Sequence, residues 1–386
     1  MRKQALAVVV LVLLSACAPQ SGPAPAPAKP AAPSAPAAPA APAPPAAPQA
    51  SAPTSPTSNA GPGGSPIDVK YAYAPRLPMI PVFVAQEKGF FDEQGLAVDF
   101  VPFAGGSNEM LAPLSQGQLD VAAAGLSAGM VNAAADGVLF RMVADEGQIA
   151  HGRSVYNLSV RSDVAAKFKT VADLKGSSGG APAIDSGLSL PYTFYKIAQA
   201  AGLTTPDGLE FANFNFVETP PGGQGDQIAM FQNKVQEWQI TVEPTPALLE
   251  DQGLGVRWLR TDEIVKDPIQ AYTILYGEHF MKEKPEGARK FMIAYLKGLR
   301  YFLDNVDTNA AEINAIAAKH AKVPEAVVAR SLWAYYDPNG RMDLASMQDQ
   351  HDFWLKKGLI RKGIGQVSQI VDYSYLDGAL TALGTR

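Results

Sequence analysis

The sequence FVAQEKGFFDEQGL occupies residues 83–96 and marks a change from helix to strand. Its first half belongs to a predicted helix over residues 79–88, which leads to Gly89 as a typical helix end. Its last residue, Leu96, begins a predicted strand that continues to Phe103. The stretch therefore predicts a helix followed by a strand, which is the repeating unit of an α/β sheet.

The same order of elements continues on both sides of this stretch. Upstream, residues 68–73 alternate polar with apolar side chains and predict a strand. Downstream, the sequence predicts a helix at 108–116, a strand at 119–124, a helix at 128–135 and a strand at 139–144. Short strands that alternate with helices predict an α/β sheet with right-handed crossovers. In such a sheet the ligand lies at the carboxyl ends of the strands.

A second block of the chain repeats this pattern. It predicts strands at 155–160, 181–184, 211–217, 238–242 and 270–276, and helices at 171–174, 190–201 and 225–233. The remaining sequence is mainly helical, at 285–303, 309–321, 325–335 and 344–357. The 320 residues from Ile67 onward are enough for one large domain or two medium ones.

Residues 1–66 differ from the rest in composition. They contain no Asp or Glu, and 16 of the 32 prolines lie between Pro19 and Pro66. Subtracting their charge of +3 from the net −5 of the chain leaves −8 on the remaining residues. This acidic balance argues against a nucleic-acid partner, because phosphate binding needs a basic surface. An Ala/Pro-rich tract without periodicity predicts a disordered linker over residues 17–66.

The single cysteine, Cys17, completes an export signal. Arg2 and Lys3 precede a ten-residue apolar run at 5–14, which is too short to span a bilayer. The segment LSAC at residues 14–17 resembles the lipobox of bacterial lipoproteins. That resemblance implies that residues 1–16 are a lipoprotein signal peptide, that cleavage precedes Cys17 and that Cys17 is lipidated. The alternative is a plain secretory signal, and either way the protein is exported.

Five segments in order resemble the substrate-binding proteins of ABC importers. They are residues 83–96 quoted above, GGS at 105–107, GQLDV at 117–121, TVADLKG at 170–176 and TVEP at 241–244. The similar branch of this family binds nitrate, taurine and other sulfonates, or the pyrimidine precursor of thiamin and related vitamins. The resemblance covers nearly all of residues 67–380.

The resemblance implies an α/β fold of the periplasmic-binding-protein type II class. Two α/β lobes would be joined by two extended crossings, with the C-terminal helices packed on lobe one. Lobe one would comprise residues 67–158 and 268–386, and lobe two residues 159–267. The implied role is that of a monomeric solute receptor, anchored through Cys17 on the extracytoplasmic face of the membrane, in the periplasm or at the cell surface. Its partners would be a small solute and the permease subunits of an importer.

Candidate ligand contacts lie in loops at predicted strand ends, where backbone N–H groups and short polar side chains face a ligand. In lobe one they are Tyr73, Arg76, Ser107, Asn108, Gly125, Leu126 and Ser127. In lobe two they are Asp185, Ser186, Trp238 and Glu243, of which the resemblance favours Ser186 and Glu243. Structural alternatives stand beside them: Ser107 as a helix cap, Tyr73 as a packing residue, Arg76 as a solvated charge.

Two classes of ligand fit these candidates. A sulfonate or nitrate needs an arginine or helix N-termini, which Arg76 with Ser107, Asn108 and Ser127 would provide. A thiamin-precursor pyrimidine or a riboflavin-like heterocycle needs aromatic stacking and a carboxylate that accepts N–H groups. Tyr73, Trp238 and Glu243 would provide these. The sequence leaves both classes open.

A serine hydrolase is a more distant alternative. The segment GLSAG at residues 125–129 matches the nucleophile elbow, with Ser127 as nucleophile. All four histidines follow Ser127, but no His-Gly-Gly segment precedes it. The sequence shows no zinc-ligand spacing and no phosphate-binding loop. A distant branch of the family makes the thiamin pyrimidine with a cysteine-rich segment, which residues 67–386 lack. We therefore expect a receptor without cofactor or metal, not an enzyme.

Overall fold

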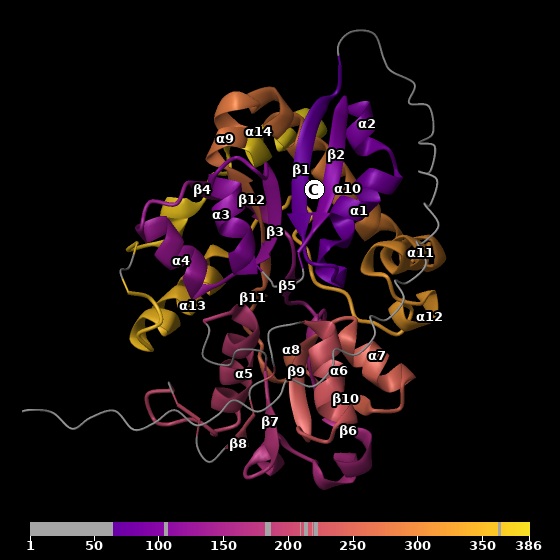
Figure 1. Ribbon diagram of the computed structural model, residues 1–386, viewed down its shortest axis with the longest axis vertical. Helices are drawn as coiled ribbons and strands as arrows, with labels where there is room; N and C mark the ends of the chain where they lie inside the picture. Colours follow the sequence, from indigo (N-terminus) through magenta and orange to yellow (C-terminus); the bar gives the residue numbers. More distant parts are fainter. Residues whose placement is uncertain are drawn as a thin grey trace, which may run out of the picture. The chain divides into compact units, whose positions relative to one another are not determined.

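Two β-sheets organise the chain, one in each of two lobes (Figure 1). The computed structural model describes residues 65–103, 107–181, 187–208, 210–211, 215–217, 219, 223–361 and 364–386. Within these residues each sheet has five strands. The fold is the two-lobed mixed α/β fold that the sequence resemblance implies.

The first sheet has the strand order β2, β1, β3, β12, β4. The strands are β1 (Ile67–Tyr73), β2 (Leu96–Pro102), β3 (Val121–Gly125), β4 (Phe140–Asp145) and β12 (Tyr272–Gly277). β1 runs parallel to β2 and β3, as chain segments joined by helices do. β12 returns from late in the sequence and inserts antiparallel between β3 and β4.

The second sheet has the order β10, β6, β9, β7, β8. Its strands are β6 (Tyr156–Arg161), β7 (Ser178–Gly180), β8 (Asn215–Phe216), β9 (Trp238–Val242) and β10 (Gly255–Arg260). β7 is parallel to β8 and β9, whereas β6 is antiparallel to β9 and β10. The predicted boundary of lobe one at residue 158 falls inside β6, which belongs entirely to this sheet. The lobe boundaries stay a prediction.

Two extended crossings connect the sheets and pair with each other. The first crossing contains β5 (Gln148–Ile149) and the second contains β11 (Ile269–Gln270). The two short strands are antiparallel, with Ile269 opposite Ile149 and Gln270 opposite Gln148. The Gln270 side chain also donates to Asp145 Oδ1 at 2.7 Å, which ties the second crossing to the end of β4.

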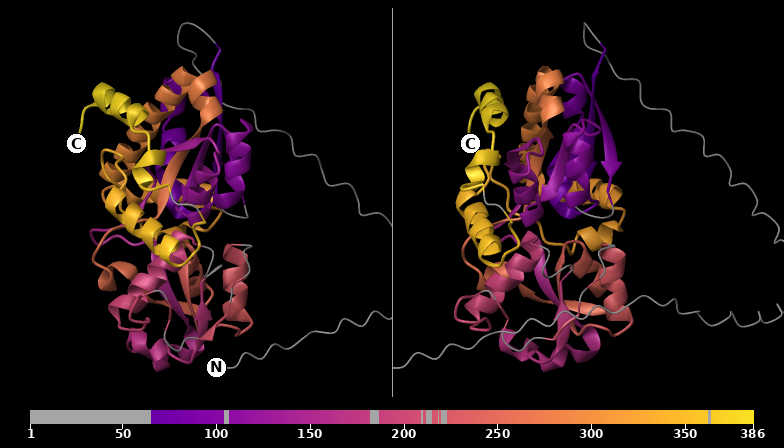
Figure 2. Two further views of the ribbon diagram at one scale, coloured as in Figure 1. Left: turned by 90° about the vertical axis from the view of Figure 1, so that its left-hand side faces the viewer. Right: turned by 60° about the vertical axis from the view of Figure 1, so that its left-hand side comes forward.

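Helices pack around the first sheet on both sides. They are α1 (Ile80–Glu87), α2 (Phe90–Glu93), α3 (Leu111–Ser115), α4 (Ala128–Ala135), α9 (Glu278–Glu283), α10 (Pro285–Asn305), α11 (Ala310–Ala321), α12 (Glu325–Val328), α13 (Leu344–Lys356) and α14 (Ser374–Leu383). α10 buries Phe291, Tyr295 and Phe302 at helical spacing and packs against α1 and α14. Figure 2 shows the C-terminal helices, in yellow, side by side with the first lobe.

The second sheet is covered by α5 (Ser189–Ala200), α6 (Gln224–Gln232), α7 (Thr245–Asp251) and α8 (Thr261–Ile264). Short 3₁₀ turns are η1 (Leu77–Met79), η2 (Ser107–Met110), η3 (Ser162–Lys167), η4 (Val171–Leu174) and η5 (Val367–Ile370). Within the described ranges no helix has the length and apolar character that crossing a membrane requires.

Two predicted elements differ from the structure. The helix predicted at 325–335 ends at Val328, because the chain then extends and Tyr335 pairs with Gln148 of the first crossing. The strand predicted at 181–184 is β7, three residues earlier, where Gly179 and Gly180 pair with β9. Residues 182–184 of that prediction lie outside the described residues. Both differences arise from pairing with distant segments, which a local pattern does not contain.

Candidate functional site

The loop after β3 meets the second lobe at the junction between the two sheets. The Leu126 N–H donates to the Ala271 carbonyl at 3.0 Å, which fixes the loop to the second crossing. The Leu126 carbonyl in turn accepts the Ser189 N–H of α5 at 3.0 Å. The predicted contacts Gly125, Leu126 and Ser127 therefore lie where the lobes touch.

Three side chains that were predicted to contact the ligand form hydrogen bonds that hold the loop after β3 in place. The Ser107 hydroxyl accepts the Gly125 N–H at 2.7 Å, and the Ser127 hydroxyl donates to Asn108 Oδ1 at 2.8 Å. Ser127 is fully buried and also caps α4, since its Oγ accepts the Met130 N–H at 3.2 Å. The structure brings Ser107, Asn108 and Ser127 together as predicted, but it uses them to shape the loop.

Two phenols and one serine line the second-lobe side of the junction. The Ser189 hydroxyl lies 3.3 Å from the Ala271 carbonyl, which accepts its hydrogen, so the Tyr156 hydroxyl at 3.0 Å is left to donate to Ser189. The rings of Tyr156 and Tyr272 lie 6.0 Å apart at an angle of 63°. These three residues join β6, α5 and β12 at one point.

Arg76 supplies positive charge to this point. It lies half-buried before η1, and within the described part of the chain its guanidinium has neither a hydrogen bond nor a carboxylate partner. Burial raises the pKa of both Tyr156 and Tyr272, and the charge of Arg76 acts against this rise on each phenol. Both phenols remain neutral at physiological pH. Because Tyr156 donates its hydrogen to Ser189, the Tyr272 hydroxyl is the phenol left to donate beside Arg76. Such a set of groups can bind an anion.

Tyr73, at the end of β1, packs inside lobe one. Its ring lies 4.9 Å from Phe83 and 6.2 Å from Tyr71, and its side chain is almost fully buried. The structure thus gives Tyr73 the packing role that the sequence offered as its alternative.

Trp238 lies in the core of the second lobe. Its indole N–H donates to the Ser177 hydroxyl at 3.0 Å, and its ring stacks on Phe194 at 4.8 Å. The side chain is fully buried, because its position in β9 faces the apolar side of the sheet. The structure therefore does not bring Trp238 to the junction.

Glu243 is also fully buried, at the end of β9. Its Oε1 accepts from Arg257 Nε at 3.0 Å and from Asn157 Nδ2 at 3.2 Å. Burial raises the pKa of Glu243 to about 7, although Arg257 lowers it. Glu243 therefore balances an internal arginine. The predicted contacts Asp185 and Ser186, like Cys17, lie outside the described residues.

No histidine is placed to activate Ser127. His279 bonds to Glu283 at 3.0 Å, His320 to Glu87 at 2.7 Å and His351 to Asp352 at 2.9 Å. The ring of His151 packs 4.6 Å from Tyr335. Among the described residues no cluster of three His, Cys, Asp or Glu side chains could hold a metal ion.

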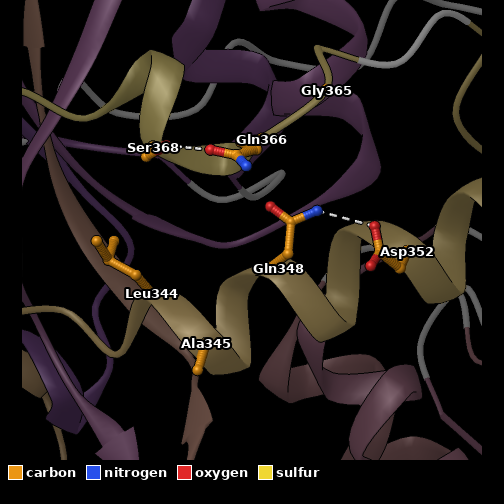
Figure 3. Close-up of a pocket in the computed structure, with 7 residues that line it drawn as sticks. All are labelled: Leu344, Ala345, Gln348, Asp352, Gly365, Gln366 and Ser368. Atoms are coloured by element: carbon orange, nitrogen blue, oxygen red, sulfur yellow. Dashed lines mark hydrogen bonds between the residues drawn. The ribbon is translucent and has the colours of Figure 1, made fainter.

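A pocket of about 510 Å³ lies in the C-terminal region (Figure 3). Its lining consists of Leu344, Ala345, Gln348, Asp352, Gly365, Gln366 and Ser368. The central Gln348 already donates to Asp352 at 2.8 Å and accepts the Val367 N–H at 2.9 Å. Because no predicted contact lines this pocket, we place the candidate site at the junction.

The sequence-based prediction missed Tyr156, Ser189 and Tyr272. Tyr156 and Tyr272 are the first residues of strands that follow the two crossings, and Ser189 begins α5. Their position next to the crossings is the signal that could have found them, because crossings between lobes bring chain segments to a shared site.

The family model described as NMT1/THI5 like matches residues 78–308, which is more than half of the chain. The chain belongs to the NMT1/THI5-like family. No curated protein matches the sequence at a significant level.

Solved structures with the same fold include two sulfonate-binding proteins and a nitrate-binding protein. The alkanesulfonate-binding protein SsuA from Xanthomonas axonopodis pv. citri, bound to MOPS, is 16% identical with a TM-score of 0.60, covering 80% of this chain and 99% of that one. The aliphatic sulphonate-binding SsuA from Escherichia coli is 16% identical with a TM-score of 0.60, covering 81% and 100%. The nitrate-binding NrtA from Synechocystis PCC 6803 is 15% identical with a TM-score of 0.63, covering 83% and 90%. At these identities the similarity shows the fold.

Proposed function

We propose that this member of the NMT1/THI5-like family is the solute-binding receptor of an ABC importer and that it captures a small oxyanion, such as a sulfonate, taurine or nitrate. The observation that carries this proposal is the half-buried guanidinium of Arg76 beside Tyr156 and Tyr272, for which the described residues supply no partner. The shared fold with sulfonate-binding and nitrate-binding proteins supports it.

The physical argument rests on charge and donor count. A half-buried arginine loses part of its hydration and gains most from a bidentate oxyanion, whose geometry matches the guanidinium fork. Burial raises the pKa of both phenols, so at neutral pH neither adds negative charge, and the Tyr272 hydroxyl can add an O–H donor. An oxyanion would therefore compensate the one charge that this junction leaves unpaired among the described residues.

The alternative of a pyrimidine or riboflavin-like heterocycle is less well supported. Trp238 stacks on Phe194, and Glu243 pairs with Arg257, so neither side chain is available at the junction. Tyr73 packs on Phe83. The hydrolase alternative loses its base, because Ser127 donates to Asn108 and no histidine contacts it. We infer a binding role without catalysis.

Export, lipid anchoring through Cys17 and delivery to permease subunits complete the proposed role. They rest on the basic, apolar and small residues before Cys17 and on the family resemblance of the segments quoted above. The acyl chains would hold the receptor to the membrane with about 0.8 kcal/mol per buried methylene. The linker would let the lobes reach the permease.

The test compares Arg76→Gln with the wild-type chain in a thermal-shift screen. The solutes are nitrate, taurine, ethanesulfonate, hydroxymethylpyrimidine and riboflavin. At a hundred times its dissociation constant, a bound solute should stabilise the wild type by about 2.7 kcal/mol. Arg76→Gln should weaken binding of that solute by about 10- to 100-fold, because hydrogen bonds to a charged group contribute about 1.5–3 kcal/mol.

The control is Arg361→Gln, which removes an exposed arginine paired with Asp136 and should leave binding unchanged. A shift with an anion in the wild type and in the control, lost in Arg76→Gln, supports the proposal. A shift with a heterocycle alone, or an anion shift that survives in Arg76→Gln, contradicts it.

A further inference from the structure

The segment Gly187–Ser189 of the second lobe forms a short backbone pairing with the segment Leu126–Ala128 of the first. The Ala128 N–H donates to the Gly187 carbonyl at 2.7 Å, and the Ser189 N–H donates to the Leu126 carbonyl at 3.0 Å. Between them, Ser127 and Leu188 form an antiparallel bridge. We call this pairing the clasp. It joins two loops that are about sixty residues apart in the sequence.

Glycine is the one residue type that fits the clasp at position 187. Its φ of +69° lies in the left-handed region that side chains with a Cβ disfavour. A Cβ on Gly187 would also lie 2.5 Å from the Ala128 Cβ, which is far inside contact distance. Any larger residue at 187 must therefore move the second-lobe loop away from α4.

The clasp occupies the start of α4. Ala128 is the first residue of this helix, and the N–H groups of a first turn have no partner within the helix. Ser127 satisfies the Met130 N–H, and the Gly187 carbonyl satisfies that of Ala128. The Gly187 carbonyl thus occupies the N-terminus of α4, where the sequence predicted an anionic ligand. Arg76 is then the positively charged group left to bind that ligand.

The clasp also fixes the phenol that faces Arg76. Ser189 follows directly, and its hydroxyl lies 3.0 Å from the Tyr156 hydroxyl and 3.3 Å from the Ala271 carbonyl. When Gly187 and Leu188 leave the first lobe, Ser189 must leave with them. The position of the Tyr156 hydroxyl therefore depends on the clasp.

We propose that the clasp holds the two lobes together in the absence of solute and that Gly187 is a positioning residue for the ligand site. Backbone hydrogen bonds between the two lobes close them, and the solute further stabilises this closed arrangement. The effect on solute affinity rests on the proposed function. The clasp consists of hydrogen bonds within the chain, so its test needs no solute.

The first experiment measures amide hydrogen exchange in the ligand-free full chain. The wild type should protect the amides of Ala128 and Ser189, and Gly187→Ala should expose them and speed their exchange at least tenfold. The matched control is Gly202→Ala. Gly202 has nearly the same φ, +68°, but nothing lies within 4 Å of its missing Cβ. It carries the same backbone strain without the contact, so its exchange at the clasp should stay at the wild-type level.

A rescue variant separates the clasp from a general folding defect. In Gly187→Ala combined with Ala128→Gly, the Cβ with which the new methyl would collide is absent. The next atoms, Leu359 Cδ1 and the Ala128 Cα, lie at the ordinary contact distances of 3.5 Å and 3.6 Å. Protection should return in this double variant. Fast exchange of the Ala128 and Ser189 amides in the wild type, or slow exchange in Gly187→Ala, would overturn the proposal.

The second experiment measures the affinity for nitrate and ethanesulfonate by calorimetry. Gly187→Ala should weaken the binding of whichever probe the wild type binds by about tenfold, while Gly202→Ala and the rescue variant keep it. Unchanged affinity in Gly187→Ala would remove its positioning role. If neither probe binds the wild type, the proposed function fails for these anions, while the exchange experiment still decides whether the clasp exists.

Discussion

Glu146 follows β4 directly and is fully buried, with no partner for either carboxylate oxygen within the described residues. Burial raises its pKa well above the usual value, and the neighbouring charge of Asp145 raises it further. Tyr295 lies beside it, but the Tyr295 hydroxyl donates to the Asp145 carbonyl. The Tyr71 hydroxyl nearby also lacks a partner. Glu146 therefore keeps its proton to a higher pH in the folded chain than in the unfolded chain.

This difference in protonation makes stability depend on pH. The folded-state pKa lies above the unfolded value of about 4.3, so folding binds a proton between the two. Stability should fall as the pH rises above about 4.3, by up to about 1.4 kcal/mol per unit, until Glu146 ionises in the folded chain. Glu146→Gln removes this dependence. Urea unfolding from pH 5 to 8 should show the free energy of unfolding of the variant rising relative to that of the wild type, by up to about 1.4 kcal/mol per pH unit.

The control for this series is Glu109→Gln, at an exposed position in η2. Its stability difference from the wild type should stay constant across the same pH range. A Glu146→Gln variant whose difference from the wild type is equally constant would show that Glu146 is ionised in the folded chain.

Ser107, Asn108 and Ser127 lie together because they follow β2 and β3, two parallel strands on either side of β1 whose carboxyl ends lie at the same end of the first sheet. Their contact with a ligand stays a prediction. Trp238 was expected at a ligand and lies in a core, because its neighbour Phe194 is distant in sequence. Burial of one aromatic side chain depends on the whole lobe, which a local pattern does not describe.

At the scale of elements, α10 approaches α1 closely at Gly298. A Cβ there would lie 2.5 Å from the Pro81 carbonyl oxygen and 2.6 Å from the Ala85 Cβ. Gly298→Ala would gain about 1 kcal/mol of helix propensity, but crowding of a packed contact costs about 1–3 kcal/mol and involves rigid backbone here. We expect a net loss of stability, measured as a lower urea midpoint.

Gly378 in α14 provides the matched substitution, since nothing lies within 4 Å of its missing Cβ. Gly378→Ala should raise the free energy of unfolding by up to about 1 kcal/mol through helix propensity alone. Two Gly→Ala changes in helices should thus have opposite signs. If Gly298→Ala raises the free energy of unfolding, α1 and α10 can move apart to make room for the methyl group without loss of stability.

Most of the long, periodic elements could be predicted, although β10 and α14 were missed. Short strands that depend on distant pairing could not be predicted. The helix predicted at 285–303 is α10, and the strand predicted at 238–242 is β9. No local pattern indicates β5 and β11, because two residues per strand show no alternation. These short strands form the crossings, so the junction was the part of the fold least visible in the sequence.

At the scale of the whole molecule, α5 connects the lobes a second time. The Tyr192 hydroxyl donates to Asp349 of α13, and Lys196 Nζ lies 3.1 Å from the same carboxylate. The Tyr192 ring packs edge-on at 5.3 Å against Phe353. Together with the clasp at its start, α5 contacts the first lobe through both its N-terminus and its side. Closure therefore involves α5 together with the contact between α7 and α12, where Arg330 pairs with Asp251 at 2.6 Å. The proposed solute site lies next to the start of α5.

The proposed lipid anchor would determine where the lobes bind their solute, and a substitution at Cys17 tests it. If the segment up to residue 16 is a lipoprotein signal, Cys17→Ser removes the acylated thiol and with it the anchor. Expressed in a bacterial host with labelled palmitate, the wild type should be labelled and should sediment with membranes. Cys17→Ser should be unlabelled and should not remain stably attached to membranes. Ser21→Ala, a change in the linker, should behave as the wild type. A wild type that is exported without label would instead identify residues 1–16 as a plain secretory signal.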